Sequence, residues 1–139
     1  VSEIREKPPA VLMDTGSPHH VQMVTGLQDI DVAREGAKLR YGLYGENGRN
    51  INFVEAVGDN LFAVRTYERG VEDETLSCGT GVTAVALAMH YTGKTKERQV
   101  RIEARGGALL ITFEPGKKGY ENIYLSGPAV QVFKGEIQC

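Results

Sequence analysis

The residues best suited to chemistry lie in one short segment around Cys78. The run Ser77-Cys78-Gly79-Thr80-Gly81 places this cysteine immediately before a predicted helix over residues 81–91. A thiolate at the start of a helix is stabilised by the positive end of the helix dipole and by the unpaired N–H groups of the first turn. Because both effects favour the reactive form of a cysteine, the sequence predicts that Cys78 can act as a base.

The glycines beside Cys78 would leave room for a ligand. Gly79 and Gly81 carry no side chain, so a small molecule could approach the backbone closely. The amides of Gly79, Thr80 and Gly81 could hold an anion such as a carboxylate. A base and a carboxylate site would then lie side by side. The alternative is an inert structural thiol, with Gly-Thr-Gly serving only as a turn and a helix cap.

The predicted helix over residues 81–91 is the element that must position this segment. Its residues are apolar nearly all round, which is typical of a buried helix, and Gly93 is placed to end it. Short strands are predicted on both sides of it, over residues 10–13, 19–24, 51–57, 61–68, 100–105, 109–113, 123–125 and 129–133. We therefore expect an α+β fold in which a curled, mostly antiparallel sheet or barrel wraps around a central buried helix.

The remaining segments are predicted to be connections. Residues 1–9 read as a linker or N-terminal arm, and residues 10–139 as one domain. A second helix is expected over residues 29–39, capped by Asp29 or Asp31. Residues 41–50 and 69–77 are predicted loops, and we expect the acidic run at 72–74 to be solvated.

Composition limits the classes of function. The 139 residues carry a net charge of −2 with interspersed acids and bases, which indicates no nucleic-acid surface. The longest apolar run covers residues 84–89, far short of a membrane span. The charged N-terminus shows no signal-peptide core, so we expect a cytoplasmic protein. Two cysteines do not indicate a disulfide framework, and no metal site or cofactor is predicted.

The Cys78 segment belongs to a series of motifs that resembles the C-terminal half of the diaminopimelate epimerases. The motifs occur in family order and cover nearly the whole chain: residues 16–21 (Gly-Ser-Pro-His-His-Val), 49–54 (Arg-Asn-Ile-Asn-Phe-Val), 68–70 (Glu-Arg-Gly), 74–75, 77–81, 126–129 (Ser-Gly-Pro-Ala) and 132–137. Each motif alone is weak, but the ordered set is specific.

The resemblance implies a cofactor-independent epimerase with two cysteines. One thiolate removes the α-proton of the amino acid, and a thiol on the opposite face returns a proton. Cys78 matches the second of these cysteines. The first belongs to the family's N-terminal half, and Cys139, at the other end of this chain, lacks the corresponding motif. We therefore expect the isolated chain to be inactive, to need the missing N-terminal half as its partner, and to self-associate, for example as a homodimer.

The resemblance also assigns substrate contacts. Gly79 and Thr80 match positions that bind the carboxylate, and Asn50, Glu68 and Arg69 match substrate-binding positions. For Arg69 the backbone could carry the role as well as the side chain.

Two upstream residues complete the assignment. His19 matches a histidine that tunes the cysteines, together with Glu68. Ser17 replaces the family's substrate-binding asparagine and offers one donor where the amide offers two. From the residues alone, His19 or His20 could be a satisfied structural histidine.

Three functions follow. The first is one half of an enzyme that converts LL- to meso-diaminopimelate in lysine and peptidoglycan biosynthesis. The second is a related isomerase such as a proline racemase-like enzyme; a phenazine-biosynthesis isomerase is disfavoured by the cysteine. The third is a non-enzymatic fragment that only binds a partner.

Overall fold

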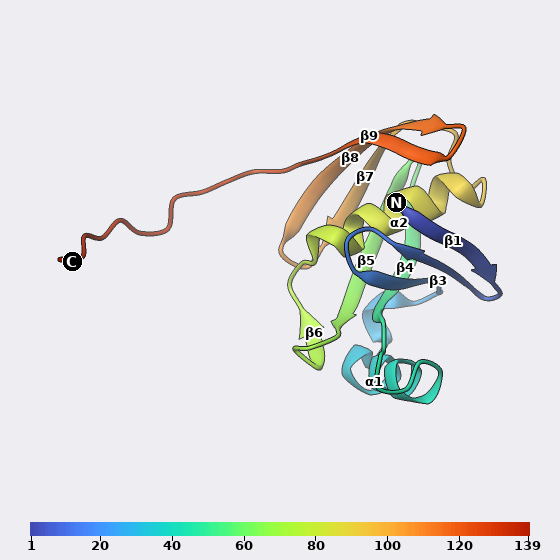
Figure 1. Ribbon diagram of the computed structural model, residues 1–139, viewed down its shortest axis with the longest axis horizontal. Helices are drawn as coiled ribbons and strands as arrows, with labels where there is room; N and C mark the ends of the chain where they lie inside the picture. The colour runs from blue at the N-terminus through green and yellow to red at the C-terminus, as the bar shows by residue number, and fades with distance from the viewer.

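The computed structural model describes the backbone of residues 1–139 and every side chain except that of Ser2. A nine-stranded sheet curls around one central helix, α2 (Gly79–Tyr91), as Figure 1 shows. The strands are β1 (Ser2–Lys7), β2 (Ala10–Asp14), β3 (Pro18–Met23), β4 (Asn50–Gly58), β5 (Leu61–Glu68), β6 (Asp73–Thr75), β7 (Gln99–Ala104), β8 (Gly107–Gly116) and β9 (Gly119–Ser126). The predicted α+β architecture is confirmed.

The sheet is mostly antiparallel. Its order is β1-β2-β3-β4-β5-β7-β8-β9, and β6 pairs with β5 beside this path. The two parallel pairs, β3 with β4 and β5 with β7, are those whose connections contain the helices. A parallel pair needs such a crossover, whereas the turn 58–60 can join β4 to β5 as a hairpin.

Helix α2 is buried because its sequence leaves no polar face. Val82 and residues 84–89 are all at most 2% exposed, and they pack against the inner side chains of the sheet. The helix begins two residues earlier than predicted, so that Cys78 is its N-cap. Gly93 adopts a positive φ of 74°, which suits a glycine after a helix C-terminus, as predicted.

Helix α1 (Val32–Gly42) covers the outer side of the sheet at β4 and β5. The side chain of Asp31 accepts a hydrogen bond from the Arg34 N–H at 3.1 Å, so Asp31 is the cap and Asp29 instead ends the short 3₁₀ helix η1 (Leu27–Asp29). Tyr67 packs so tightly against Gly36 that a Cβ at this glycine would overlap its ring. A second, smaller apolar cluster lies at this contact.

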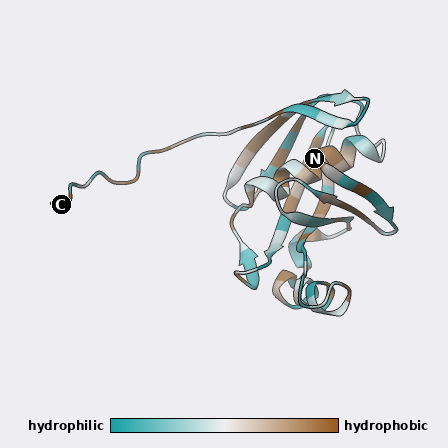
Figure 2. Cartoon of the chain, viewed as in Figure 1, coloured by the Kyte–Doolittle hydropathy of each residue, from teal (hydrophilic) through white to brown (hydrophobic). Residues whose placement is uncertain are grey.

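Three predicted segments differ from the structure. Residues 1–9 are not a linker, because Ser2–Lys7 form β1, which pairs with β2. The loop 69–77 contains the short strand β6. The strand predicted at 129–133 is absent: residues 127–139 have no regular structure and extend away from the body, although hydrophobic residues recur along them (Figures 1 and 2). Among the described residues, no helix has the length and apolar character needed to cross a membrane.

Candidate active site

Cys78 lies where the turn after β6 meets α2. It is half-buried, with φ −127° and ψ 110°, and its carbonyl accepts the first helical hydrogen bond from Val82 N–H at 2.9 Å. The N–H groups of Gly79, Thr80 and Gly81 donate to no other described group. These free amides and the adjacent sulfur are the arrangement expected for a base beside an anion site.

Gly81 is required by the packing around the sulfur. A Cβ at this position would lie 2.7 Å from Asn52 Oδ1 and 3.3 Å from Cys78 Sγ. The first distance is too short for any side chain. Glycine therefore allows the start of α2 to approach β4 and brings the cysteine against the polar side chains of the sheet.

The hydroxyl of Thr80 is the centre of the hydrogen-bond network. Its Oγ1 lies 2.9 Å from His19 Nε2, 3.0 Å from Ser17 Oγ and 3.5 Å from Cys78 Sγ. Thr15 Oγ1 also donates to the Thr80 carbonyl at 2.8 Å. The start of α2 is thus tied to the segment that leads into β3.

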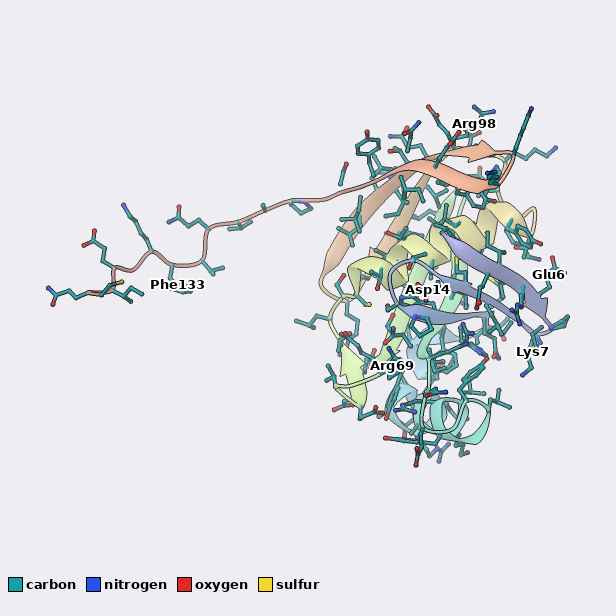
Figure 3. All side chains as sticks on the ribbon, viewed as in Figure 1. Glu6, Lys7, Asp14, Arg69, Arg98 and Phe133 are labelled. Carbon is teal, nitrogen blue, oxygen red and sulfur yellow. The ribbon has the colours of Figure 1, made fainter. Side chains whose placement is uncertain are left out.

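Asn50 links this cluster to the turn after β5. Its Oδ1 accepts the Arg69 backbone N–H at 2.8 Å, and its Nδ2 donates to Ser17 Oγ at 3.2 Å and to the Pro18 carbonyl at 3.3 Å. The backbone N–H of Arg69 is therefore already used within the protein. The Arg69 guanidinium donates to the Asn47 carbonyl at 2.6 Å, and Figure 3 shows the Arg69 side chain at the turn after β5.

His19 is fully buried and neutral. Asn52 Nδ2 lies 3.1 Å from its Nδ1, and Thr66 Oγ1 donates to Asn52 Oδ1 at 2.9 Å. Burial lowers the pKa of His19 to about 4; the charge of Asp14 opposes the shift, while Arg49 and Arg69 add to it. The imidazole therefore takes up no second proton near neutral pH and stays uncharged.

The structure brings most of the predicted site residues into one network. Hydrogen bonds connect Ser17, His19, Asn50, Arg69, Cys78 and Thr80. Glu68 and Gly79 adjoin this network through their chain neighbours. Both ring nitrogens of His19 contact other residues, so the predicted pairing with Glu68 is not among the described hydrogen bonds.

Three participants were missed from the sequence: Thr15, Asn52 and Thr66. For Asn52 a signal was present, because residues two apart on a strand share a face and Asn50 was already a candidate. Thr66 is the direct cross-strand partner of Asn52, which only the register reveals.

His20 is the structural histidine of the pair. Its Nδ1 lies 2.7 Å from Tyr44 Oη and its Nε2 lies 2.9 Å from Gln22 Oε1. Burial lowers the pKa of His20, which the hydrogen bond to Gln22 partly opposes. The side chain is buried and both nitrogens are satisfied, so it has no free group for chemistry.

The acidic run at 72–74 was wrongly expected to be solvated, because two of its three carboxylates are paired. Arg40 Nε donates to Glu72 at 3.0 Å, and Tyr67 Oη donates to its other oxygen at 3.0 Å. Arg65 holds Glu74 through two bonds of 2.7 Å. These pairs fasten the turn that carries Arg69 to the rest of the sheet.

No group of three or more His, Cys, Asp or Glu side chains that could hold a metal ion occurs among the described residues. Ser77, the residue before Cys78, lines a cavity of about 190 Å³ together with Pro128 and residues 106–109.

Comparison with known proteins shows the family of this chain. The family profile described as diaminopimelate epimerase matches residues 11–132. The chain belongs to the diaminopimelate epimerase family. It is 51% identical to a diaminopimelate epimerase of Flavobacterium psychrophilum over 99% of this chain and 54% of that protein. A diaminopimelate epimerase of Chlorobaculum tepidum is 41% identical over 90% of this chain and 48% of its own length. The chain thus spans about half the length of these relatives.

Solved structures share the fold of this diaminopimelate epimerase family member. A probable proline racemase of Agrobacterium radiobacter matches with a TM-score of 0.57 and 19% identity, over 79% of this chain and 38% of that one. A phenazine biosynthesis protein of Bacillus anthracis matches with a TM-score of 0.56 and 18% identity, over 84% and 37%. At this identity the likeness concerns architecture alone.

Proposed function

We propose that this chain is one half of a cofactor-independent diaminopimelate epimerase and that Cys78 is one of its two acid–base groups. The observation that carries the proposal is the position of Cys78 as the N-cap of α2, with a sulfur beside three free amides. The family relationship indicates the reaction, and this geometry fits it.

The amides of Gly79, Thr80 and Gly81 would bind the substrate carboxylate. Removal of an α-proton places negative charge on the carboxylate oxygens, and fixed N–H donors stabilise such charge without reorganisation. The sulfur at residue 78 then faces the α-carbon from one side. Asn50 and Arg69 extend the polar surface of the site, and the Glu68 carboxylate would suit a substrate ammonium group.

Inversion needs a second acid–base group on the opposite face. Cys139 does not supply it, because it is exposed at the end of the C-terminal segment. The second thiol would come from a partner that corresponds to the family's N-terminal half. We therefore expect no epimerase activity from this chain alone. A cytoplasmic location remains a prediction.

Reconstitution tests the proposal and its main alternative. The chain is combined with the N-terminal half of the Flavobacterium psychrophilum relative, and each half alone is the control. We expect inversion of LL-diaminopimelate by the pair and none by either half. Inversion of proline or 4-hydroxyproline in place of diaminopimelate would favour a racemase-like function and contradict the proposed substrate.

A further inference from the structure

The donors and acceptors around Thr80 can be assigned from neighbouring groups that can only donate or only accept a hydrogen bond. Asn52 Nδ2 lies 3.0 Å from the main-chain carbonyl of His20, which can only accept a hydrogen bond. The amide nitrogen must therefore face this carbonyl, and Asn52 Oδ1 must accept from Thr66. The orientation of the Asn52 amide is thereby fixed.

This orientation determines where the proton of His19 lies. The NH₂ group of Asn52 also faces His19 Nδ1 at 3.1 Å, and an amide NH₂ only donates. Nδ1 must accept and is therefore unprotonated. The single proton of the neutral ring lies on Nε2, which faces the Thr80 and Ser17 hydroxyls.

Asn50 fixes the second branch in the same way. A main-chain N–H can only donate, so the bond from Arg69 N–H makes Asn50 Oδ1 the acceptor. Asn50 Nδ2 must then donate to Ser17 Oγ. The Ser17 hydroxyl is left with one proton to donate, and its neighbours at hydrogen-bond distance are Thr80 Oγ1 and His19 Nε2. Since Nε2 already carries a proton, Ser17 donates to Thr80.

The Thr80 hydroxyl thus receives hydrogen bonds and must direct its own proton elsewhere. Its remaining neighbour is Cys78 Sγ at 3.5 Å. We infer that Asn52 is a positioning residue that fixes the direction of this network, so that the Thr80 hydroxyl donates to the Cys78 sulfur. Such a bond is strongest when the sulfur is a thiolate.

The inference gives Ser17 a role that its serine character suits. Its hydroxyl accepts from Asn50 and donates to Thr80, which requires a group that does both through one atom. The inference rests on the proposed function, because it takes Cys78 as the base. Its two tests nevertheless need no substrate and no partner, so they can fail independently of epimerase activity.

The first test locates the proton of His19 in the isolated chain by ¹⁵N NMR at pH 7. We expect protonated Nε2 and unprotonated Nδ1. In Asn52→Asp the carboxylate can only accept, so Nδ1 should become protonated. Thr66→Val is the matched control, because it removes a hydrogen bond from the same amide on its oxygen side and should leave the proton on Nε2. Protonated Nδ1 in the unsubstituted chain would overturn the inference.

The second test measures the hydrogen bond at the sulfur and does not depend on Asn52→Asp folding. Cys78 is alkylated with iodoacetamide over a range of pH in a Cys139→Ser background, which removes the other thiol, and the pH at which the rate is half-maximal is recorded. This midpoint reports the stability of the thiolate separately from its nucleophilicity. We expect Thr80→Val to move the midpoint upward, by an amount that corresponds to an about fivefold weaker ionisation of the thiol, the effect of losing one ordinary hydrogen bond to the thiolate, and Thr80→Ser to restore the midpoint. An unchanged midpoint in Thr80→Val, or an equal shift in Thr80→Ser, would overturn the inference.

Discussion

At the scale of single residues, the site depends on a histidine that stays neutral. His19 has no exposed surface, and its Nδ1 faces an amide NH₂ that would repel a second ring proton. Its pKa of about 4 is far below that of an unfolded histidine. Acid should therefore destabilise the folded state relative to the unfolded state through this residue.

We predict that the free energy of unfolding falls as the pH drops from about 6.5 to 4. In this window the unfolded His19 takes up a proton and the folded one does not, so the unfolded state is favoured. Between pH 7 and pH 5 the loss from this residue is about 2 kcal/mol. Urea unfolding at pH 7 and at pH 5 measures this difference in the free energy of unfolding. The substitution His19→Gln should remove the share that comes from His19. Burial also lowers the pKa of His20 and His90, so some pH dependence should persist. An unchanged difference in His19→Gln would contradict the assignment.

Glu72 should show its effect in a lower pH range. Burial alone would raise its pKa, but hydrogen bonds from Gly70 N–H, Tyr67 and Arg40 outweigh burial and lower the pKa to about 2. The stability that the carboxylate adds is present above pH 4.5 and is lost as the pH falls toward 2.

We predict that Glu72→Gln lowers the free energy of unfolding by about 1–2 kcal/mol at pH 7, because Arg40 loses a charged acceptor. The difference from the unsubstituted chain should shrink as the pH approaches 2. Asp73→Asn is the matched control, since Asp73 is exposed and should change stability by less than about 0.5 kcal/mol. Equal effects of the two substitutions in urea unfolding would show that the Glu72 pairing adds nothing.

At the scale of elements, packing and strand register place the site. The apolar sequence of α2 predicted a buried helix, and the turn at 58–60 predicted a hairpin; both are confirmed. The spacing from Asn50 places Asn52 on the same face of the strand, but its contacts with His19 and Thr66 were not predictable, because they depend on the parallel register of β3 with β4 and on the pairing of β4 with β5. The pairing of Glu72 with Arg40, 32 residues earlier in the chain, is equally invisible to local patterns.

Helix α1 offers a matched test of this packing. Gly36→Ala would place a Cβ into the Tyr67 side chain, whereas Gly42, in the same helix, has no heavy atom within 4 Å of such a Cβ. We predict that Gly36→Ala lowers the free energy of unfolding by about 1–3 kcal/mol through overpacking. Gly42→Ala should be neutral or stabilise by up to about 1 kcal/mol. Similar values for both in urea unfolding would show that the contact between α1 and β5 is not tight.

At the scale of the whole molecule, the proposed reaction needs acid–base groups on two sides of the substrate, and this chain would supply one of them. The thiol of Cys78 belongs to the hydrogen-bond network around Thr80. Cys139 is exposed at the end of the C-terminal segment, and Phe133 in that segment lies away from the body of the protein (Figure 3). Family motifs, which are local in sequence, predicted several residues that the structure joins in one hydrogen-bond network. The prediction of a strand at 129–133 was wrong. The apolar residues of this segment are exposed, and the segment pairs with no strand within the described chain.

The most direct measurement is the exchange of the substrate α-proton with deuterium from the solvent by the reconstituted pair of halves. With Cys78 present, we predict that deuterium enters the α-carbon of diaminopimelate and that the product has inverted configuration. With Cys78→Ser in the same pair, inversion should be lost, since a hydroxyl cannot serve as the base at neutral pH. Inversion at an undiminished rate in Cys78→Ser would contradict the central role of this cysteine.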